Sequence, residues 1–151
     1  MTTLFDAPVR PMDEPWQEES RSRSLATHSH VDDQVRDVAV LLFERLSKAL
    51  AAGARWTSPV DDEVVLAAMR FAMRYLRVDP DSRALPHISV TDDAGLQLDW
   101  HLAGLHLDVE FFPTGDRAFS LASPDEPDLF GDPEHYSSHL RLEFQKAVAR
   151  L

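Results

Sequence analysis

Imidazole and carboxylate side chains alternate with apolar ones over residues 96–111, at a spacing that can gather them on one surface. If Ala103 and Gly104 form the turn of a β-hairpin, each polar residue of the first strand faces a polar residue of the second. The polar cross-strand pairs are then Gln97 with Glu110, Asp99 with Asp108, and His101 with His106. A shift of one residue would mix apolar and polar faces, so the pattern predicts both this register and a polar face.

This polar face allows three interpretations. Like charges directly opposite each other destabilise a sheet by about 0.2 to 1 kcal/mol per pair, so Asp99 facing Asp108 needs a reason. The acids can serve solubility and keep the sheet from pairing with other chains. They can instead bind arginine or lysine side chains of a protein partner, which offsets the repulsion. The third interpretation is a zinc, manganese or iron site whose ligands are Asp99, His101, His106 and Asp108.

We predict a non-enzymatic protein-interaction module of the antitoxin, immunity, chaperone or adaptor type, with no catalytic residue and no cofactor. A two-stranded surface is a poor cage for a metal, and a catalytic site needs a concave pocket. The sequence has no glycine-rich phosphate loop, no HExxH motif and no Gly-x-Ser-x-Gly elbow. A metal-dependent hydrolase or nuclease at the Asp/His cluster is the alternative. The expected partner-binding residues are Gln97, Asp99, His101, His106, Asp108 and Glu110.

The charge of the chain favours a basic protein partner. It carries 26 acidic and 15 basic side chains, a net charge of −11 at pH 7. Residues 79–121 alone hold eight acidic and two basic side chains, and such a surface repels the phosphate backbone of a nucleic acid. No window approaches the roughly 20 apolar residues of a membrane span, no signal-peptide core is present, and there is no cysteine. We therefore predict a cytoplasmic protein that binds neither nucleic acid nor membrane.

The elements that position the hairpin follow from periodicity. About four short strands succeed one another on tight turns between residues 88 and 121, which makes the sheet antiparallel. Amphipathic helices are predicted over residues 31–53, from Pro59 to about residue 78, and from Pro133 to the C-terminus, with an acidic linker over residues 122–131. The predicted N-caps are Ser29, Ser58 and Asp132. The fold class is α+β, with two N-terminal helices, an antiparallel meander and a C-terminal helix.

The N-terminal residues 1–28 are predicted to be a disordered tail that precedes a single domain over residues 29–151. This segment holds three prolines and a charged run, and it has no sustained apolar period. Its large apolar anchors, Phe5 and Trp16, could form a short docking peptide.

The first predicted helix is more apolar than one buried stripe requires. Val40, Leu41 and Phe43 widen its apolar surface beyond the stripe that would face the sheet. Side chains of this kind are hard to bury in so small a monomer, so we predict a homodimer.

The segments GLQLDWH at 95–101 and LHLDVEFFPTGD at 105–116 resemble a set of small bacterial proteins. That set has a G-[IV]-Q-L-E-W hairpin followed by L-E-I-E and a Pro-x-Gly turn, and the likeness covers about residues 55–121. Asp99 and Asp108 stand where glutamates are common, so the acidity persists on shorter side chains. The resemblance implies a bacterial domain of unknown role and carries no catalytic assignment.

Overall fold

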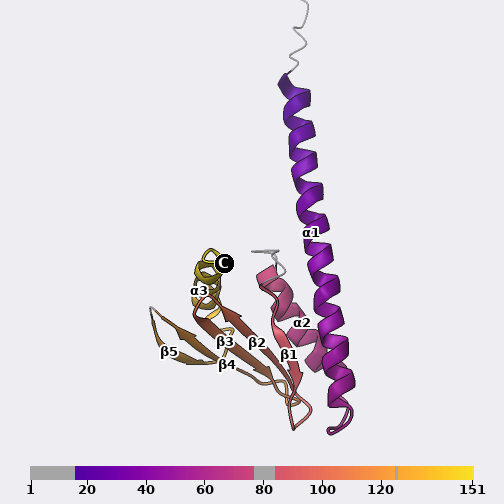
Figure 1. The fold of residues 1–151 in the computed structure, drawn as a ribbon, viewed down its shortest axis with the longest axis vertical. Helices are drawn as coiled ribbons and strands as arrows, with labels where there is room; N and C mark the ends of the chain where they lie inside the picture. The colour runs from indigo at the N-terminus through magenta and orange to yellow at the C-terminus, as the bar shows by residue number, and fades with distance from the viewer. Residues whose placement is uncertain (1–15, 77–83, 125) are drawn as a thin grey trace, which may run out of the picture.

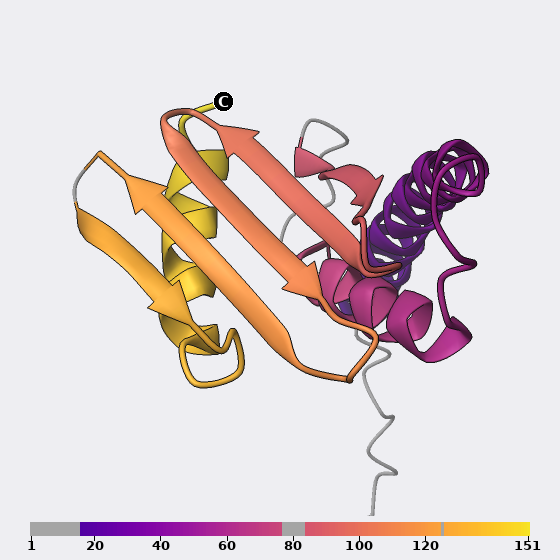
Figure 2. The same cartoon turned by 90° about the horizontal axis from the view of Figure 1, so that it is seen from below.

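The computed structural model describes residues 16–76, 84–124 and 126–151, and for residues 16–31 and Leu76 it describes the backbone alone. The described residues form a five-stranded antiparallel sheet in the order β1-β2-β3-β4-β5, with three helices packed against one of its faces (Figures 1 and 2). The helices are α1 Trp16–Gly53, α2 Asp62–Leu76 and α3 Ser137–Val148. The strands are β1 His87–Val90, β2 Leu96–Leu102, β3 Leu105–Phe111, β4 Arg117–Ser123 and β5 Glu126–Gly131. Within these residues no helix is both long and apolar enough to cross a membrane.

The α+β class and the antiparallel meander are confirmed, but the sheet has five strands where about four were expected. The additional strand is β5, which pairs with β4 inside the segment predicted to be a linker. Leu129 is the only residue of β5 that is even partly buried. An edge strand held by backbone pairing tolerates Pro127 and exposed acids, so it lacks the alternation that identifies a strand.

Helix α1 begins at Trp16, so the predicted start near Val31 with Ser29 as N-cap is wrong. No glycine or proline interrupts the chain between Pro15 and Gly53, and the backbone can therefore stay helical throughout. Figure 1 shows the N-terminal half of α1 extending beyond the rest of the described chain. That half has no sheet to pack against, which explains why its sequence lacks an apolar period. The tail prediction for residues 1–15, and Phe5 with it, lies outside the described residues.

The other two predicted N-caps are also displaced. Asp61 caps α2 in place of Ser58, because its Oδ1 accepts the N–H of Glu63 at 2.8 Å. Asp132 stands at a turn that precedes α3, where its Oδ1 accepts the N–H of Glu134 at 2.9 Å. An aspartate serves a helix start or a free turn by the same local bond, so sequence position alone did not separate the two cases.

The β2–β3 hairpin has the predicted register throughout. Leu102 pairs with Leu105, and the alternation continues to Leu96 opposite Phe111. Ala103 and Gly104 form the turn with φ angles of 43° and 89°, and both are positive, as a type I′ turn requires. The apolar pairs of the hairpin are therefore buried beneath the helices, and the polar pairs face outward.

Aromatic side chains pack the sheet against α2 and α3. Trp100 of β2 lies 5.9 Å from Tyr75 and 6.0 Å from Phe144 between ring centroids, and it also contacts Phe71 at 6.2 Å. The Trp100 indole donates a hydrogen bond from Nε1 to the carbonyl oxygen of Ala84 at 2.9 Å. Because this cluster holds the inner face of β2 and β3, the side chains of the outer face are carried on a rigid support.

Candidate functional site

The candidate site is the outer face of the sheet, which the three helices leave uncovered. Figure 2 shows α2 and α3 behind the sheet and α1 beside its β1 edge, with the opposite face open toward the viewer. Burial alternates along β2 and β3, so that apolar residues point to the helices and polar ones point outward. All six predicted site residues lie on this outer face. We call Asp99, His101, His106 and Asp108 the outer cluster.

The outer cluster is joined by short contacts centred on one carboxylate. His101 Nε2 lies 3.0 Å from Asp99 Oδ2, and His106 Nε2 lies 3.0 Å from Asp99 Oδ1. The two imidazole rings stack with centroids 4.1 Å apart and planes 22° from parallel. His106 Nε2 also approaches Asp108 Oδ2 at 3.3 Å. The structure thus brings together all four residues that were predicted as metal ligands in the alternative interpretation.

The repulsion between Asp99 and Asp108 is offset by local donors. Gln97 donates a hydrogen bond from Nε2 to Asp108 Oδ1 at 2.9 Å, and Ser120 Oγ donates to Asp108 Oδ2 at 3.4 Å. Asp99 has the two imidazoles as partners. Hydrogen bonds to a carboxylate stabilise its charged form. Both acids are therefore accommodated side by side in the unbound chain.

Ser120 is a site residue that sequence reasoning missed. It faces Asp108 in the register between β3 and β4. The turn at residues 113–116 fixes that register, so extending the hairpin logic by one strand could have found it.

Glu110 shows that the face is crowded with negative charge. Burial raises the pKa of its carboxyl group, and the nearby Asp93 and Asp108 raise it further. Both effects disfavour the charged form, and a cation placed nearby would reverse the second one. The environment of Glu110 is thus suited to a basic ligand.

A row of outward residues crosses all five strands through the outer cluster. His87 of β1 faces Asp99, which faces Asp108. Ser120 continues the row and faces Phe130 of β5, whose side chain is 65% exposed. Phe130 gives the polar face an apolar end. Sequence reasoning missed it because β5 was taken as a linker.

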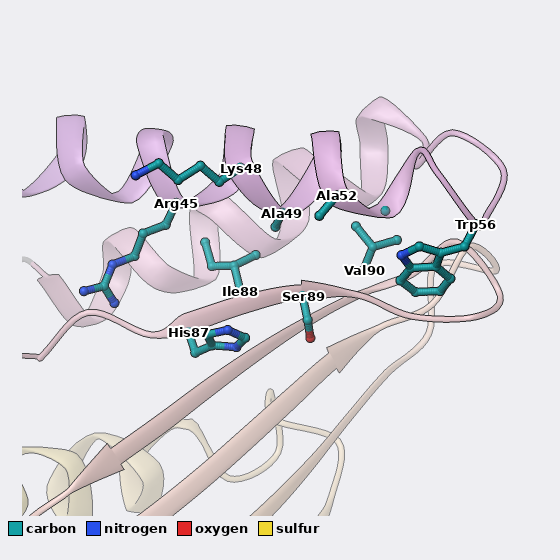
Figure 3. A pocket seen from close by; sticks show the side chains of 10 residues that line it. Arg45, Lys48, Ala49, Ala52, Trp56, His87, Ile88, Ser89 and Val90 are labelled. Carbon is teal, nitrogen blue, oxygen red and sulfur yellow. The ribbon is translucent and has the colours of Figure 1, made fainter.

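Two cavities lie near the β1 edge of the described sheet, and no residue of the outer cluster lines either of them. One of about 420 Å³ lies between α1 and β1, where Ile88 and Val90 point toward the helix while His87 and Ser89 point away (Figure 3). Another, of about 250 Å³, lies where α1 passes into the segment before α2. The outer cluster itself is open to solvent, since the side chain of His101 is 65% exposed and that of His106 is 44% exposed.

Arg45, a basic residue beside the larger cavity, holds a structural position. Arg45 of α1 donates from Nη1 to the carbonyl oxygens of Leu85 and Pro86, at 3.1 and 2.8 Å. These bonds hold the chain that enters β1 against α1. Arg45 thus serves to position the edge of the sheet.

The apolar residues that suggested a dimer are exposed in the single chain. Val40 is 53% exposed, Leu41 40% and Phe43 55%. They lie outside the stripe of α1 that packs on the sheet, which is made by Val38, Leu42 and Leu46. The homodimer itself stays a prediction.

Comparison of the chain with protein-family models, with curated proteins and with solved structures finds no match. The resemblance of the hairpin to small bacterial proteins therefore stays a prediction. The function has to be argued from the geometry of the outer face.

Proposed function

We propose that this protein is a non-enzymatic interaction module that binds a basic protein segment through the outer face of its sheet. The observation that carries the proposal is the pair Asp99 and Asp108, two carboxylates held opposite each other on a face that no described helix covers. Local donors offset the repulsion between the two acids but give no stability that a neutral pair would lack, so their placement favours a role in recognition.

The two carboxylates keep capacity to bind a cation. Their side chains are 23% and 26% exposed, and each carboxylate has about four lone-pair positions, of which local donors use only a part. An arginine side chain can bind such an oxygen pair with two parallel hydrogen bonds. Phe130, at the end of the same row, offers a partner an apolar contact next to the charges.

The proposal includes the antitoxin, immunity, chaperone and adaptor types, which all act by binding another protein. It also includes a cytoplasmic location, which the absence of cysteine favours. The net charge of −11 supports a protein partner over a nucleic acid.

The proposal is tested by quantitative capture from a lysate of the source cells, with tagged full-length chains. Asp99→Asn with Asp108→Asn removes two charges from the outer face. Asp32→Asn with Asp33→Asn removes two charges from exposed positions on α1 and is the matched control. We expect the wild type and the control to capture the same partner, the outer-face variant to lose it, and the capture to weaken as salt rises from about 0.05 to about 0.5 M. Equal capture by both double variants would remove the basis of the proposal.

A further inference from the structure

We propose that Asp99, His101 and His106 form a binding site for a divalent transition-metal ion, with Zn²⁺ as the ion to test. The ligands of this site all come from the β2–β3 hairpin of one chain, so an ion can bind without the proposed partner, and Asp99 is shared between the two proposals.

The ligand atoms lie close to the arrangement that a bound ion requires. One carboxylate oxygen and two imidazole nitrogens lie within 4.8 Å of one another. In a tetrahedral zinc site with bonds of about 2.0 Å, neighbouring ligand atoms are about 3.3 Å apart. His101 Nε2 lies 3.0 Å from Asp99 Oδ2 and His106 Nε2 lies 3.0 Å from Asp99 Oδ1, so each imidazole is close to a different oxygen of the carboxylate. An ion bound here would lie between the carboxylate and the two imidazoles, with the side chains turned so that one oxygen and both nitrogens face it.

The hairpin holds the two imidazoles in advance of binding. His101 and His106 are direct cross-strand neighbours next to the type I′ turn. The residues on either side of them, Leu102 and Leu105 toward the turn and Trp100 and Leu107 toward the core, are buried. The two Nε2 atoms approach the same carboxylate from stacked rings. Ligands fixed in this way lose little conformational freedom on binding an ion.

Asp108 completes the surroundings of the site. Its Oδ2 lies 3.3 Å from His106 Nε2, and Gln97 and Ser120 fix its orientation. Because an ion on His106 Nε2 takes the place of the proton there, Asp108 can act as a fourth ligand or as a nearby charge. In either role its negative charge favours a dication.

The chemistry of the ligands selects the class of metal. Two imidazole nitrogens with one carboxylate suit zinc, iron, nickel or copper, while magnesium and calcium prefer oxygen ligands alone. His101 is 65% exposed and His106 is 44% exposed, so an ion here would keep positions open to water. The open positions and the solvent exposure predict micromolar affinity, well below that of a closed structural zinc site.

The experiment is a calorimetric titration of ZnCl₂ into full-length protein that has been stripped with a chelator and desalted. The site variant is His101→Asn with His106→Asn. The matched control is His135→Asn, which removes an exposed imidazole beside a carboxylate elsewhere, since His135 Nδ1 lies 3.7 Å from Asp132 Oδ2. We expect a micromolar zinc-binding event in the wild type and the control, at least tenfold weaker in the site variant, and unchanged by excess Mg²⁺.

A second measurement keeps the proposal testable if the site variant does not fold. In the wild type, long-range ¹H–¹⁵N spectra of the imidazoles report which nitrogens bind the ion. Zinc should shift the Nε2 signals of His101 and His106 and leave those of His135 in place. No micromolar binding, equal binding by the site variant, or shifts confined to other histidines would overturn the site. Any of these three results would leave the cluster as a set of His–Asp hydrogen bonds. None of the three results decides whether the protein captures a partner.

Discussion

Replacing Gly53 by alanine tests how α1 is seated on the sheet. A Cβ at this position would lie 2.7 Å from both Cβ and Cγ2 of Val90, and 3.0 Å from its Cγ1. The Cβ of Val90 moves only with the backbone of β1, so rotation of the side chain cannot relieve the contact. The end of α1 or the edge strand must shift, and forced overpacking of this kind costs about 1 to 3 kcal/mol.

The contact with Val90 decides whether Gly53→Ala stabilises or destabilises the protein. Gly53 is not among the residues with a positive φ, so alanine fits its backbone. Without the contact to Val90, Gly53→Ala would stabilise the protein by about 0.4 to 1 kcal/mol. With it, we expect a net loss of about 1 to 2 kcal/mol in the free energy of unfolding, and a melting temperature lower by about 2 to 8 °C.

Urea denaturation of four proteins measures the contact itself. These are the wild type, Gly53→Ala, Val90→Ala and the double variant. Val90→Ala removes both Cγ atoms, so the cost of Gly53→Ala should fall by at least about 0.5 kcal/mol in that background. A higher melting temperature for Gly53→Ala would refute the direct packing of α1 on β1, whereas equal costs in both backgrounds would assign the whole cost to the Cβ of residue 90.

Three further substitutions test particular interactions. Glu110→Gln should raise the melting temperature at pH 7 but not at about pH 3, because a raised pKa lowers stability as pH rises above the ordinary value of 4.5; a gain at both pH values would contradict this. Glu143→Gln should cost about 1.5 to 3 kcal/mol at pH 7 in urea denaturation. Glu143 is 2% exposed, and its Oε1 lies 2.6 Å from Lys146 Nζ in a bond that lowers the pKa of the Glu143 carboxyl group. The cost of the substitution should therefore shrink as pH falls through that pKa. A cost independent of pH would count against the bond. Trp100→Phe should cost about 2 to 4 kcal/mol in the same assay, because it removes the donor to Ala84 and leaves a cavity, and a change under 1 kcal/mol would argue against both effects.

The hairpin could be predicted from the sequence because two independent signals agree there. Alternation over strands of seven residues fixes which face is buried, and a two-residue turn at Ala103 and Gly104 fixes the pairing. Together they determine every pair from Leu102–Leu105 to Gln97–Glu110.

The elements that were missed or displaced lack such a signal. β5 is an edge strand whose residues are nearly all exposed, so no alternation marks it. The N-terminal half of α1 extends away from the sheet, and a helix without a packing partner needs no apolar stripe. In both segments the backbone forms regular secondary structure, but the sequence lacks the periodic apolar residues by which that structure is predicted.

The candidate site was predicted in its members but not in its contacts. The register alone places Asp99, Asp108 and the two histidines on one face. The hydrogen-bond donors that offset the repulsion between the two acids could not be predicted in the same way. Gln97 and His106 reach the acids only in particular side-chain rotamers, and Ser120 lies on β4. Phe130 depended on recognising β5. A sequence pattern determines which residues share a face, whereas their hydrogen bonds depend on the packing of the whole sheet.

Site-specific photo-crosslinking tests the central claim, that the partner binds the outer face. A benzophenone amino acid is placed at Phe130, on the outer face, and in a second protein at Leu142 of α3, which is 49% exposed on the helix that packs against the inner face. Both positions are exposed and apolar, so the comparison isolates the face. We predict that the captured partner crosslinks from position 130 and not from position 142. Crosslinking from position 142 alone would contradict the account, because the partner would then bind the helical side of the molecule.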